Sequence, residues 1–191
     1  VYDSYAWMST FGDPGFTFHA TSARLAAAMM MRMANADVLP YDYVEFARTM
    51  QKYVPAVQSA LGAAGWKTLS AAPIADAVTR MEQAAVAYQT ARDNALANGV
   101  SAAVAKNTNE ALLKVERALT RPEGLKTRPW FRNLIYVADE NNGYANMVFP
   151  SVNEAIRSGD QALTQREILD LAKRFDAATA AVNAARAALT P

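Results

Sequence analysis

The side chains that hold catalytic metals in proteins are scarce in this chain of 191 residues. A zinc site needs three or more ligands from histidine, cysteine, aspartate and glutamate. The sequence contains a single histidine, His19, and no cysteine, and His19 is not part of an H-E-x-x-H pattern. We therefore interpret His19 as a hydrogen-bonded core or surface residue. The sequence predicts no catalytic residue, no metal ligand and no thiol chemistry.

Two other clusters have compositions that occur in binding sites. The run Arg128-Pro129-Trp130-Phe131-Arg132 could contact nucleic acid or form cation–π pairs, and the methionines of residues 29–33 could bind a soft metal. However, 19 basic residues balance 18 acidic ones, and no basic run or stripe offers a surface for nucleic acid or an anionic membrane. We therefore favour packing for the first cluster and core filling for the second.

A non-helical segment, residues 119–150, separates two helical parts of the chain. Its prolines and glycines interrupt helices: Pro122, Gly124, Pro129, Gly143 and Pro150. Its aromatic residues are Trp130, Phe131, Tyr136, Tyr144 and Phe149. Because long ordered loops are usually functional, and because this one is rich in aromatic side chains, we predict a loop that is fixed against a core.

This segment also carries a family resemblance. From Leu119 to Tyr136 it contains the run L-x-R-P-x-G-L-x-x-R-P-W-F-R-N-x-I-Y, followed by Gly143-Tyr144-Ala145 and Phe149-Pro150. The pattern resembles the C-terminal dimerisation domain of the glutamate carboxypeptidase II and transferrin receptor family. Upstream, residues 13–42 resemble the last helix of the family's protease domain and its exit.

The resemblance implies two domains and places the chemistry elsewhere. Residues 1–40 would be the tail and last helix of a truncated peptidase-like domain, and residues 41–191 a helical dimerisation domain. Val1-Tyr2-Asp3-Ser4-Tyr5 resembles the segment that follows the family's final zinc-ligand histidine. On this interpretation the zinc and the catalytic groups belong to the longer parent protein, and this portion binds no cofactor and is not itself an enzyme.

One family substrate-binding site falls within the chain. The family places a Lys-Tyr pair near the terminal residue of the substrate, and the matching residues here are Gly143 and Tyr144. The Tyr144 hydroxyl could donate a hydrogen bond to a substrate carboxylate. Gly143 removes the cation, which puts a preference for a C-terminal glutamate in doubt. The alternative interpretation is that Tyr144 simply packs the loop.

The surrounding elements are predicted from helix starts, stops and apolar periodicity. Asp13-Pro14 starts a helix that runs to about Asn35 and is apolar nearly all round, so we expect it to be buried against a larger body. Further helices begin at the capping patterns Asp42-x-x-Glu45, Ser70–Pro73, Ser101, Ser151-x-x-Glu154 and Thr164-x-x-Glu167. Gly62, Gly65 and Asn98-Gly99 provide stops.

The apolar stripes of these helices predict an all-α fold. The last helix repeats Ile168, Phe175, Val182 and Leu189 every seven residues, which is typical of a bundle seam. We predict a four-helix up-and-down bundle with a long crossover loop, preceded by one protease-domain helix. No alternating run predicts a sheet, although residues 135–137 could form a brief extended piece.

Three functional hypotheses follow. The first is a dimerisation domain of a zinc-dependent carboxypeptidase-like protein, forming a homodimer and contacting the missing catalytic domain of its own chain. We expect that parent to be extracytoplasmic: secreted, periplasmic or membrane-anchored. The second is a small metallohydrolase, and the third a stand-alone helical interaction module. The Arg-Gly-Asp motif with which the transferrin receptor binds its partner is absent, so we expect neither transferrin nor nucleic acid as a partner.

Overall fold

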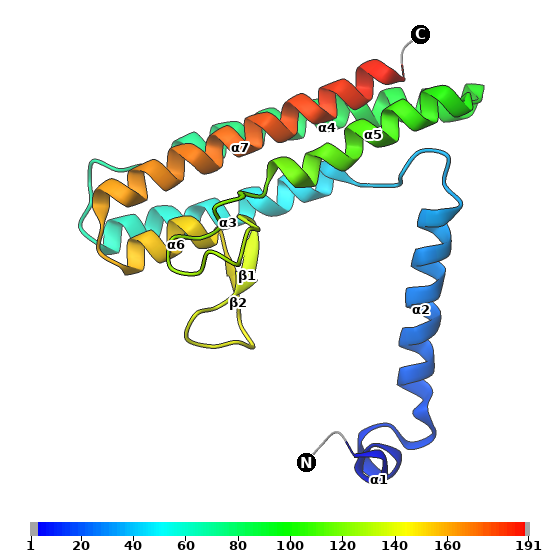
Figure 1. Ribbon diagram of the computed structural model, residues 1–191, viewed down its shortest axis with the longest axis horizontal. Helices are drawn as coiled ribbons and strands as arrows, with labels where there is room; N and C mark the ends of the chain where they lie inside the picture. The colour runs from blue at the N-terminus through cyan, green and yellow to red at the C-terminus, as the bar shows by residue number, and fades with distance from the viewer. Residues whose placement is uncertain (1–3, 190–191) are drawn as a thin grey trace. The chain divides into compact units, whose positions relative to one another are not determined.

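The computed structural model describes residues 4–189, and its regular structure is almost entirely helical (Figure 1). A short N-terminal part contains α1 (Tyr5–Trp7), a π-helical turn (Met8–Gly12), a 3-10 turn (Pro14–Phe16) and α2 (Thr17–Ala34). The remaining elements are α3 (Tyr43–Ala63), α4 (Ala72–Asn98), α5 (Ala102–Ala118), β1 (Tyr136–Ala138), β2 (Asn146–Val148), α6 (Pro150–Arg157) and α7 (Gln161–Ala188).

The chain forms two compact units, Val1–Pro40 and Tyr41–Pro191. Pro40 follows a helix that ends at Ala34, and Asp42 caps the next helix by accepting the N–H of Glu45 at 2.9 Å. The boundary lies where the sequence predicts a change of domain. That the first unit derives from a peptidase domain remains a prediction.

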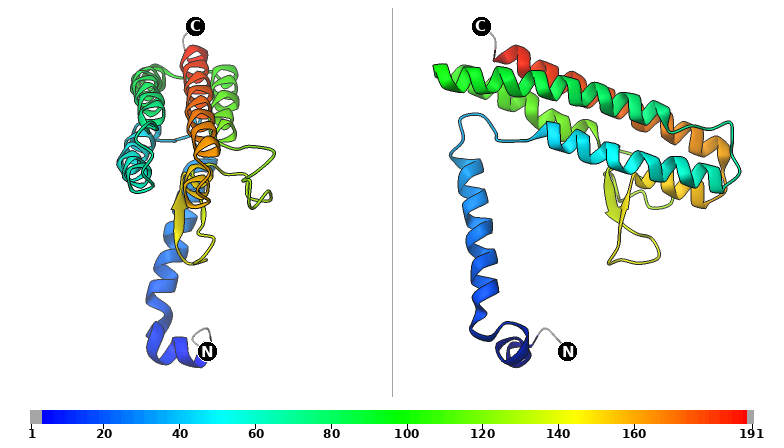
Figure 2. Two further views of the ribbon diagram at one scale, coloured as in Figure 1. Left: turned by 90° about the vertical axis from the view of Figure 1, so that its left-hand side faces the viewer. Right: turned by 180° about the vertical axis from the view of Figure 1, so that it is seen from behind.

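The second unit is a bundle built around α7. Helix α7 packs against α4, α5 and α6, while α3 packs on α4 and α6. Viewed along the bundle in the left panel of Figure 2, α7 lies between α4 and α5. The predicted helical bundle with a long crossover is confirmed. The crossover allows α7 to insert between two helices that are consecutive in sequence.

The seam of α7 is buried as its seven-residue spacing predicts. Phe175, Val182 and Ala185 are inaccessible to solvent, and Ile168 and Leu189 are nearly so. The Phe175 ring meets the buried Phe149 ring edge-on, with centroids 6.2 Å apart. The apolar side chains of the last helix therefore form the centre of the core and hold the end of the crossover segment in place.

Three predicted helix starts are wrong. Helix α2 begins at Thr17, behind the 3-10 turn of Pro14–Phe16, and not at Pro14, because Gly15 and Phe16 have left-handed backbone angles that interrupt an α-helix. Helix α6 begins at Pro150 rather than behind a Ser151 cap, and α7 begins at Gln161, where the side chain of Asp160 accepts the N–H of Leu163 at 2.8 Å. The glutamates of the two predicted capping boxes, Glu154 and Glu167, are buried. They bind arginines of the crossover segment, which sequence spacing alone does not reveal.

The crossover segment contains a two-stranded antiparallel sheet that was not predicted. Val137 pairs with Met147, and both side chains are buried. The extended piece predicted at residues 135–137 corresponds to β1, whereas β2 carries no recognisable strand pattern over its three residues. Each strand is too short for an alternating pattern to identify it.

Replacing Phe175 with alanine tests the seam. We expect a loss of about 3–5 kcal/mol in the free energy of unfolding, because the side chain is fully buried against Phe149. Urea denaturation measures it. The control is Leu169→Ala on the same helix, whose side chain is exposed and whose loss we expect to stay within about 0.5 kcal/mol. Equal small losses for both variants would contradict the seam assignment.

Candidate functional site

The crossover segment is fixed to α7 through Arg121. Its Nη1 donates to Glu167 Oε2 at 2.7 Å and to Asp170 Oδ2 at 3.2 Å, while its Nε donates to the carbonyl of Gly124 at 3.0 Å. Burial opposes the charge on Arg121, but the two carboxylates outweigh it and raise the pKa of the guanidinium. One arginine thus joins the start of the crossover to the core helix.

A second anchor joins the crossover to α6. Arg128 Nε donates to Glu154 Oε1 at 3.0 Å, and its Nη1 donates to the carbonyl of Ala138 at 2.8 Å. The Thr127 hydroxyl also donates to Glu154. The Arg128 guanidinium lies 4.8 Å from the centroid of the Phe131 ring. Arg128 therefore joins the crossover both to α6 and to the end of β1, where the turn of the hairpin begins.

These contacts explain the motif residues of the segment. Arg128 and Phe131 pack together in the cation–π pair that was the alternative, whereas the prediction of packing is wrong for Trp130, which is largely exposed. Gly124 has φ +68°, and a Cβ there would come within 2.0 Å of the Pro129 carbonyl oxygen. Only glycine fits this turn. The prediction of a loop fixed against a core is confirmed.

The two predicted substrate-binding residues lie at the tip of the hairpin. Tyr144 is fully exposed, so the alternative that it packs the loop is wrong. Its N–H donates to Asn142 Oδ1 at 3.1 Å, and Gly143 has open space around its Cα. An ordered turn thus exposes the phenol to solvent.

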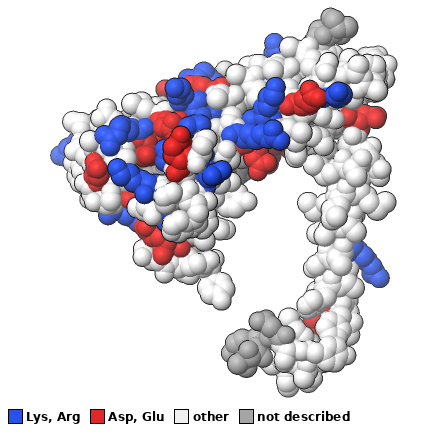
Figure 3. All heavy atoms as spheres, viewed as in Figure 1, with Lys and Arg blue, Asp and Glu red and all other residues white. Residues whose placement is uncertain are grey.

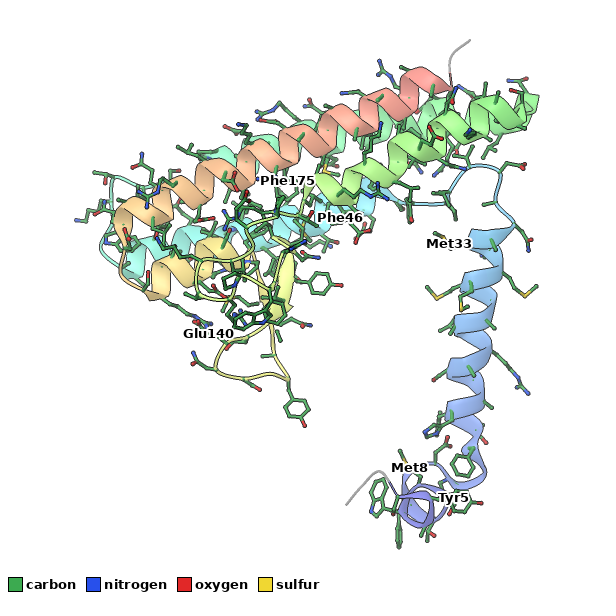
Figure 4. The ribbon with its side chains drawn as sticks, in the orientation of Figure 1. Tyr5, Met8, Met33, Phe46, Glu140 and Phe175 are labelled. Atoms are coloured by element: carbon green, nitrogen blue, oxygen red, sulfur yellow. The ribbon has the colours of Figure 1, made fainter. Side chains whose placement is uncertain are left out.

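An arginine of α6, Arg157, fastens this tip. Its Nη2 donates to Asp139 Oδ2 at 2.8 Å and its Nη1 to Glu140 Oε1 at 3.2 Å; Glu140 is labelled in Figure 4. The hydrogen bond from Arg157 lowers the pKa of the Asp139 carboxyl, as do the N–H groups of Asn141 and Asn142, against the opposing effect of burial. Sequence analysis missed Arg157, because no periodicity links residues 139 and 157.

His19 forms a pair with Asp13. The His19 Nδ1 lies 2.6 Å from Asp13 Oδ2, and the same carboxylate accepts the N–H groups of His19 and Phe18. Asp13 thus reaches the amides at the start of α2. Burial opposes its ionisation, but these hydrogen bonds, led by that from the His19 ring, lower the pKa of the Asp13 carboxyl. The predicted hydrogen-bonded histidine is confirmed.

A zinc ion does not fit the residues that the structure describes. Between residues 4 and 189 no three histidine, cysteine, aspartate or glutamate side chains come together in a metal-binding arrangement, and Asp13 with His19 supplies two ligands at most. Residues 1–3 of the segment predicted to follow the zinc-ligand histidine lie outside the described part. Across residues 4–189 no helix is both long and apolar enough to cross a membrane.

Helix α2 exposes an apolar surface. None of its residues is buried, and Phe18, Leu25 and Met29–Met31 are more than half exposed. In Figure 3 it is mostly uncharged, in contrast to the charged surface of the bundle. The predicted burial of α2 against a larger body therefore remains a prediction, whereas the prediction that its methionines fill a core is wrong within this chain. An exposed apolar surface of this kind usually marks an interaction site.

A second apolar feature is a groove on the bundle. It lies between the start of α3, the end of α5 and β1, has a volume of about 210 Å³, and includes Tyr41, Phe46, Leu113 and Tyr136 in its lining. The predicted inward positions Tyr43 and Phe46 are only half-buried because they border this groove.

A family model identifies this arrangement. Residues 69–183, more than half of the chain, match the transferrin receptor-like dimerisation domain. The chain belongs to the transferrin receptor-like dimerisation domain family. The matched region contains α4 to α6 and most of α7, and therefore both arginine anchors and the hairpin. Because this family is defined by self-association, the domain is a self-associating module of the kind found in glutamate carboxypeptidase-like proteins.

Individual relatives agree with this assignment. A probable glutamate carboxypeptidase of Arthroderma benhamiae is 28% identical over 160 residues, covering 84% of this chain and 22% of the relative. The probable glutamate carboxypeptidase LAMP1 of Arabidopsis thaliana is 26% identical over 166 residues, with coverages of 86% and 23%. The aminopeptidase NAALADL1 of Rattus norvegicus is 24% identical over 198 residues, with coverages of 100% and 26%. The chain spans about a quarter of the length of these relatives.

An inactive protein is also among the relatives. The inactive zinc metalloprotease C354.09c of Schizosaccharomyces pombe is 23% identical over 188 residues, covering 92% of this chain and 23% of the relative. The relatives of this chain thus include proteins named as peptidases and one named as inactive.

The Arg128–Glu154 anchor of the dimerisation domain can be tested by Arg128→Ala. We expect a loss of about 3–5 kcal/mol in the free energy of unfolding, because the variant leaves the buried Glu154 carboxylate without its cation. Urea denaturation measures the loss. The matched control is Arg48→Ala, whose pair with Glu82 is exposed and contributes less than about 1 kcal/mol. A loss no larger than that of the control would show that the anchor is dispensable.

The lowered pKa of Asp139 predicts a pH dependence of hairpin stability. The folded domain binds this proton less tightly than the unfolded chain, so the stabilisation exists above the usual carboxyl pKa and disappears as the pH falls through the lowered value. Asp139→Asn removes it. We expect the free energies of unfolding of wild type and variant to differ more at neutral pH than at about pH 2. A difference that is independent of pH would contradict this role.

Proposed function

We propose that this chain is the dimerisation portion of a zinc-dependent carboxypeptidase-like protein. In this proposal it supplies no reacting group, pairs two copies of the protein as a homodimer, and presents its hairpin to the substrate pocket. The match of residues 69–183 to the transferrin receptor-like dimerisation domain is the observation that carries the proposal. The relatives named as glutamate carboxypeptidases and aminopeptidases support a peptidase parent.

The exposed apolar surface of α2 supports the proposal that this chain also contacts a catalytic domain of the same polypeptide. Helix α2 has 18 residues, none of them buried, and several of its methionines are exposed. A contiguous apolar surface of this kind is usually covered by a partner. Relatives about four times as long as the matched region have ample chain for such a domain. We therefore propose that α2 packs inside the peptidase domain of the same polypeptide and that residues 1–40 are the end of that domain.

The exposure of Tyr144 supports the proposal that the hairpin forms part of the substrate pocket. Tyr144 is fully exposed on a turn that side-chain hydrogen bonds hold in shape. An exposed phenol at the tip of an ordered hairpin can donate to a carboxylate or an amide of a bound peptide. Gly143 beside it brings no charge, so the proposal does not include a fixed preference for a C-terminal glutamate.

The zinc ion and the compartment are further parts of the proposal. Zinc would be held by the catalytic domain, because this chain contains one histidine and no cysteine. We place the parent outside the cytoplasm, as a secreted, periplasmic or membrane-anchored protein. The alternative to a peptidase parent is a stand-alone helical interaction module, which the exposed apolar groove between α3 and α5 would also suit.

Sedimentation equilibrium of the full-length protein tests the pairing. We expect a dimer at micromolar concentration, because an obligate interface buries on the order of 2,000 Å² or more. The same protein truncated before Tyr41 lacks the bundle and should sediment as a monomer. A full-length monomer at these concentrations would refute the proposal.

Metal analysis distinguishes the proposed peptidase parent from the two alternatives, a small metallohydrolase and a stand-alone interaction module. We expect stoichiometric zinc in the full-length protein and none in residues 1–191 alone. Zinc and peptidase activity in residues 1–191 alone would favour the small metallohydrolase instead. A full-length protein that dimerises but contains neither zinc nor a further domain would favour the stand-alone module.

A further inference from the structure

The tip of the hairpin, residues 139–145, depends on its side chains for its shape. Asp139 Oδ1 accepts the N–H of Asn141 at 2.8 Å and that of Asn142 at 3.2 Å. Asn142 Oδ1 in turn accepts the N–H of Tyr144 at 3.1 Å. The position of Tyr144 therefore depends, through two successive side-chain caps, on the position of the Asp139 carboxylate.

That carboxylate is held by a helix of the core. Arg157 binds both Asp139 and Glu140 from the last turn of α6. Helix α6 is itself fixed, since its residues Val152, Glu154 and Ala155 are buried. A continuous series of contacts thus runs from the bundle core through Arg157, Asp139 and Asn142 to the backbone of Tyr144, which carries the exposed phenol.

The same contacts determine the charge of the tip. The segment from Ala138 to Phe149 contains no lysine, arginine or histidine, and its two carboxylates share the single cation of Arg157. The tip presents a phenol and the side-chain amides of Asn141 and Asn142. A carboxylate on the side chain of a bound peptide would meet a net negative tip that has no free cation to pair with it. A carboxamide side chain, by contrast, can both donate and accept hydrogen bonds.

We propose that Arg157 is a positioning residue that holds Tyr144 in place for the substrate, and that the tip selects a polar uncharged side chain, such as that of glutamine, over a carboxylate. The proposal rests on the proposed role of the hairpin in the substrate pocket. Arg157 acts through Asp139 and does not itself touch the substrate.

Hydrogen exchange in the full-length protein tests the positioning. In Arg157→Gln we expect the amides of residues 141–144 to exchange about fivefold faster, as for the loss of an ion pair with charge-assisted hydrogen bonds. Arg157→Lys keeps the cation and should restore most of the protection. The control is Arg80→Gln, which removes an exposed bidentate pair with Asp176 and should leave the tip unchanged. Unchanged exchange in Arg157→Gln would overturn the positioning role.

Steady-state kinetics of the full-length protein test the substrate preference, with N-acetyl dipeptides ending in glutamine or glutamate as probes. We expect a kcat/KM about tenfold higher for the glutamine peptide, corresponding to one hydrogen-bonded group. Arg157→Gln should raise KM severalfold with kcat unchanged, and Tyr144→Phe should add nothing further in that background. A preference for the glutamate peptide would overturn the proposed selectivity.

The two experiments fail separately. If Tyr144→Phe leaves KM unchanged while Arg157→Gln still accelerates exchange at the tip, the role of the hairpin in the substrate pocket is wrong and the positioning by Arg157 stands. If Tyr144→Phe raises KM but Arg157→Gln changes neither exchange nor KM, the proposed function survives and the positioning is wrong.

Discussion

Two buried arginine–carboxylate pairs determine how this domain is put together. Arg121 with Glu167, and Arg128 with Glu154, join a crossover of about thirty residues to the helices that follow it. They act together with buried apolar side chains of the segment, among them Leu125 and Leu134, because its prolines and glycines prevent a helix. Such pairs contribute little net stability compared with apolar packing, but they specify one arrangement, since any other would leave a buried charge unpaired.

The anchors also connect the core to the hairpin. Arg128 reaches the carbonyl of Ala138 at the end of β1, and Arg157, on the next turn of α6, binds Asp139 in the adjoining tip. A short helix of eight residues thus carries the positions of both the crossover and Tyr144. Packing of Phe149 against Phe175 fixes the start of that helix. The buried seam of α7 is therefore connected to the backbone that carries Tyr144.

The sequence predicted the elements that follow from local rules. Seven-residue spacing placed Phe175 and Val182 in the core, and Ser101 and Gly99 marked helix ends that the structure has at those positions. It failed where distant residues compete with local ones. Glu154 and Glu167 matched capping patterns, yet each instead pairs with an arginine many residues away. The Arg157–Asp139 contact and the three-residue strands depend on tertiary structure and leave no periodic signal.

The central proposal is that the apolar surface of α2 is covered by another part of the parent protein. Oxidation of methionines by peroxide, followed by mass spectrometry, tests this directly. In the 191-residue chain alone Met29–Met31 are exposed while Met81 and Met147 are buried. We expect Met29–Met31 to become as protected as Met81 and Met147 in the full-length protein. Rapid oxidation of Met29–Met31 in the full-length protein would contradict it.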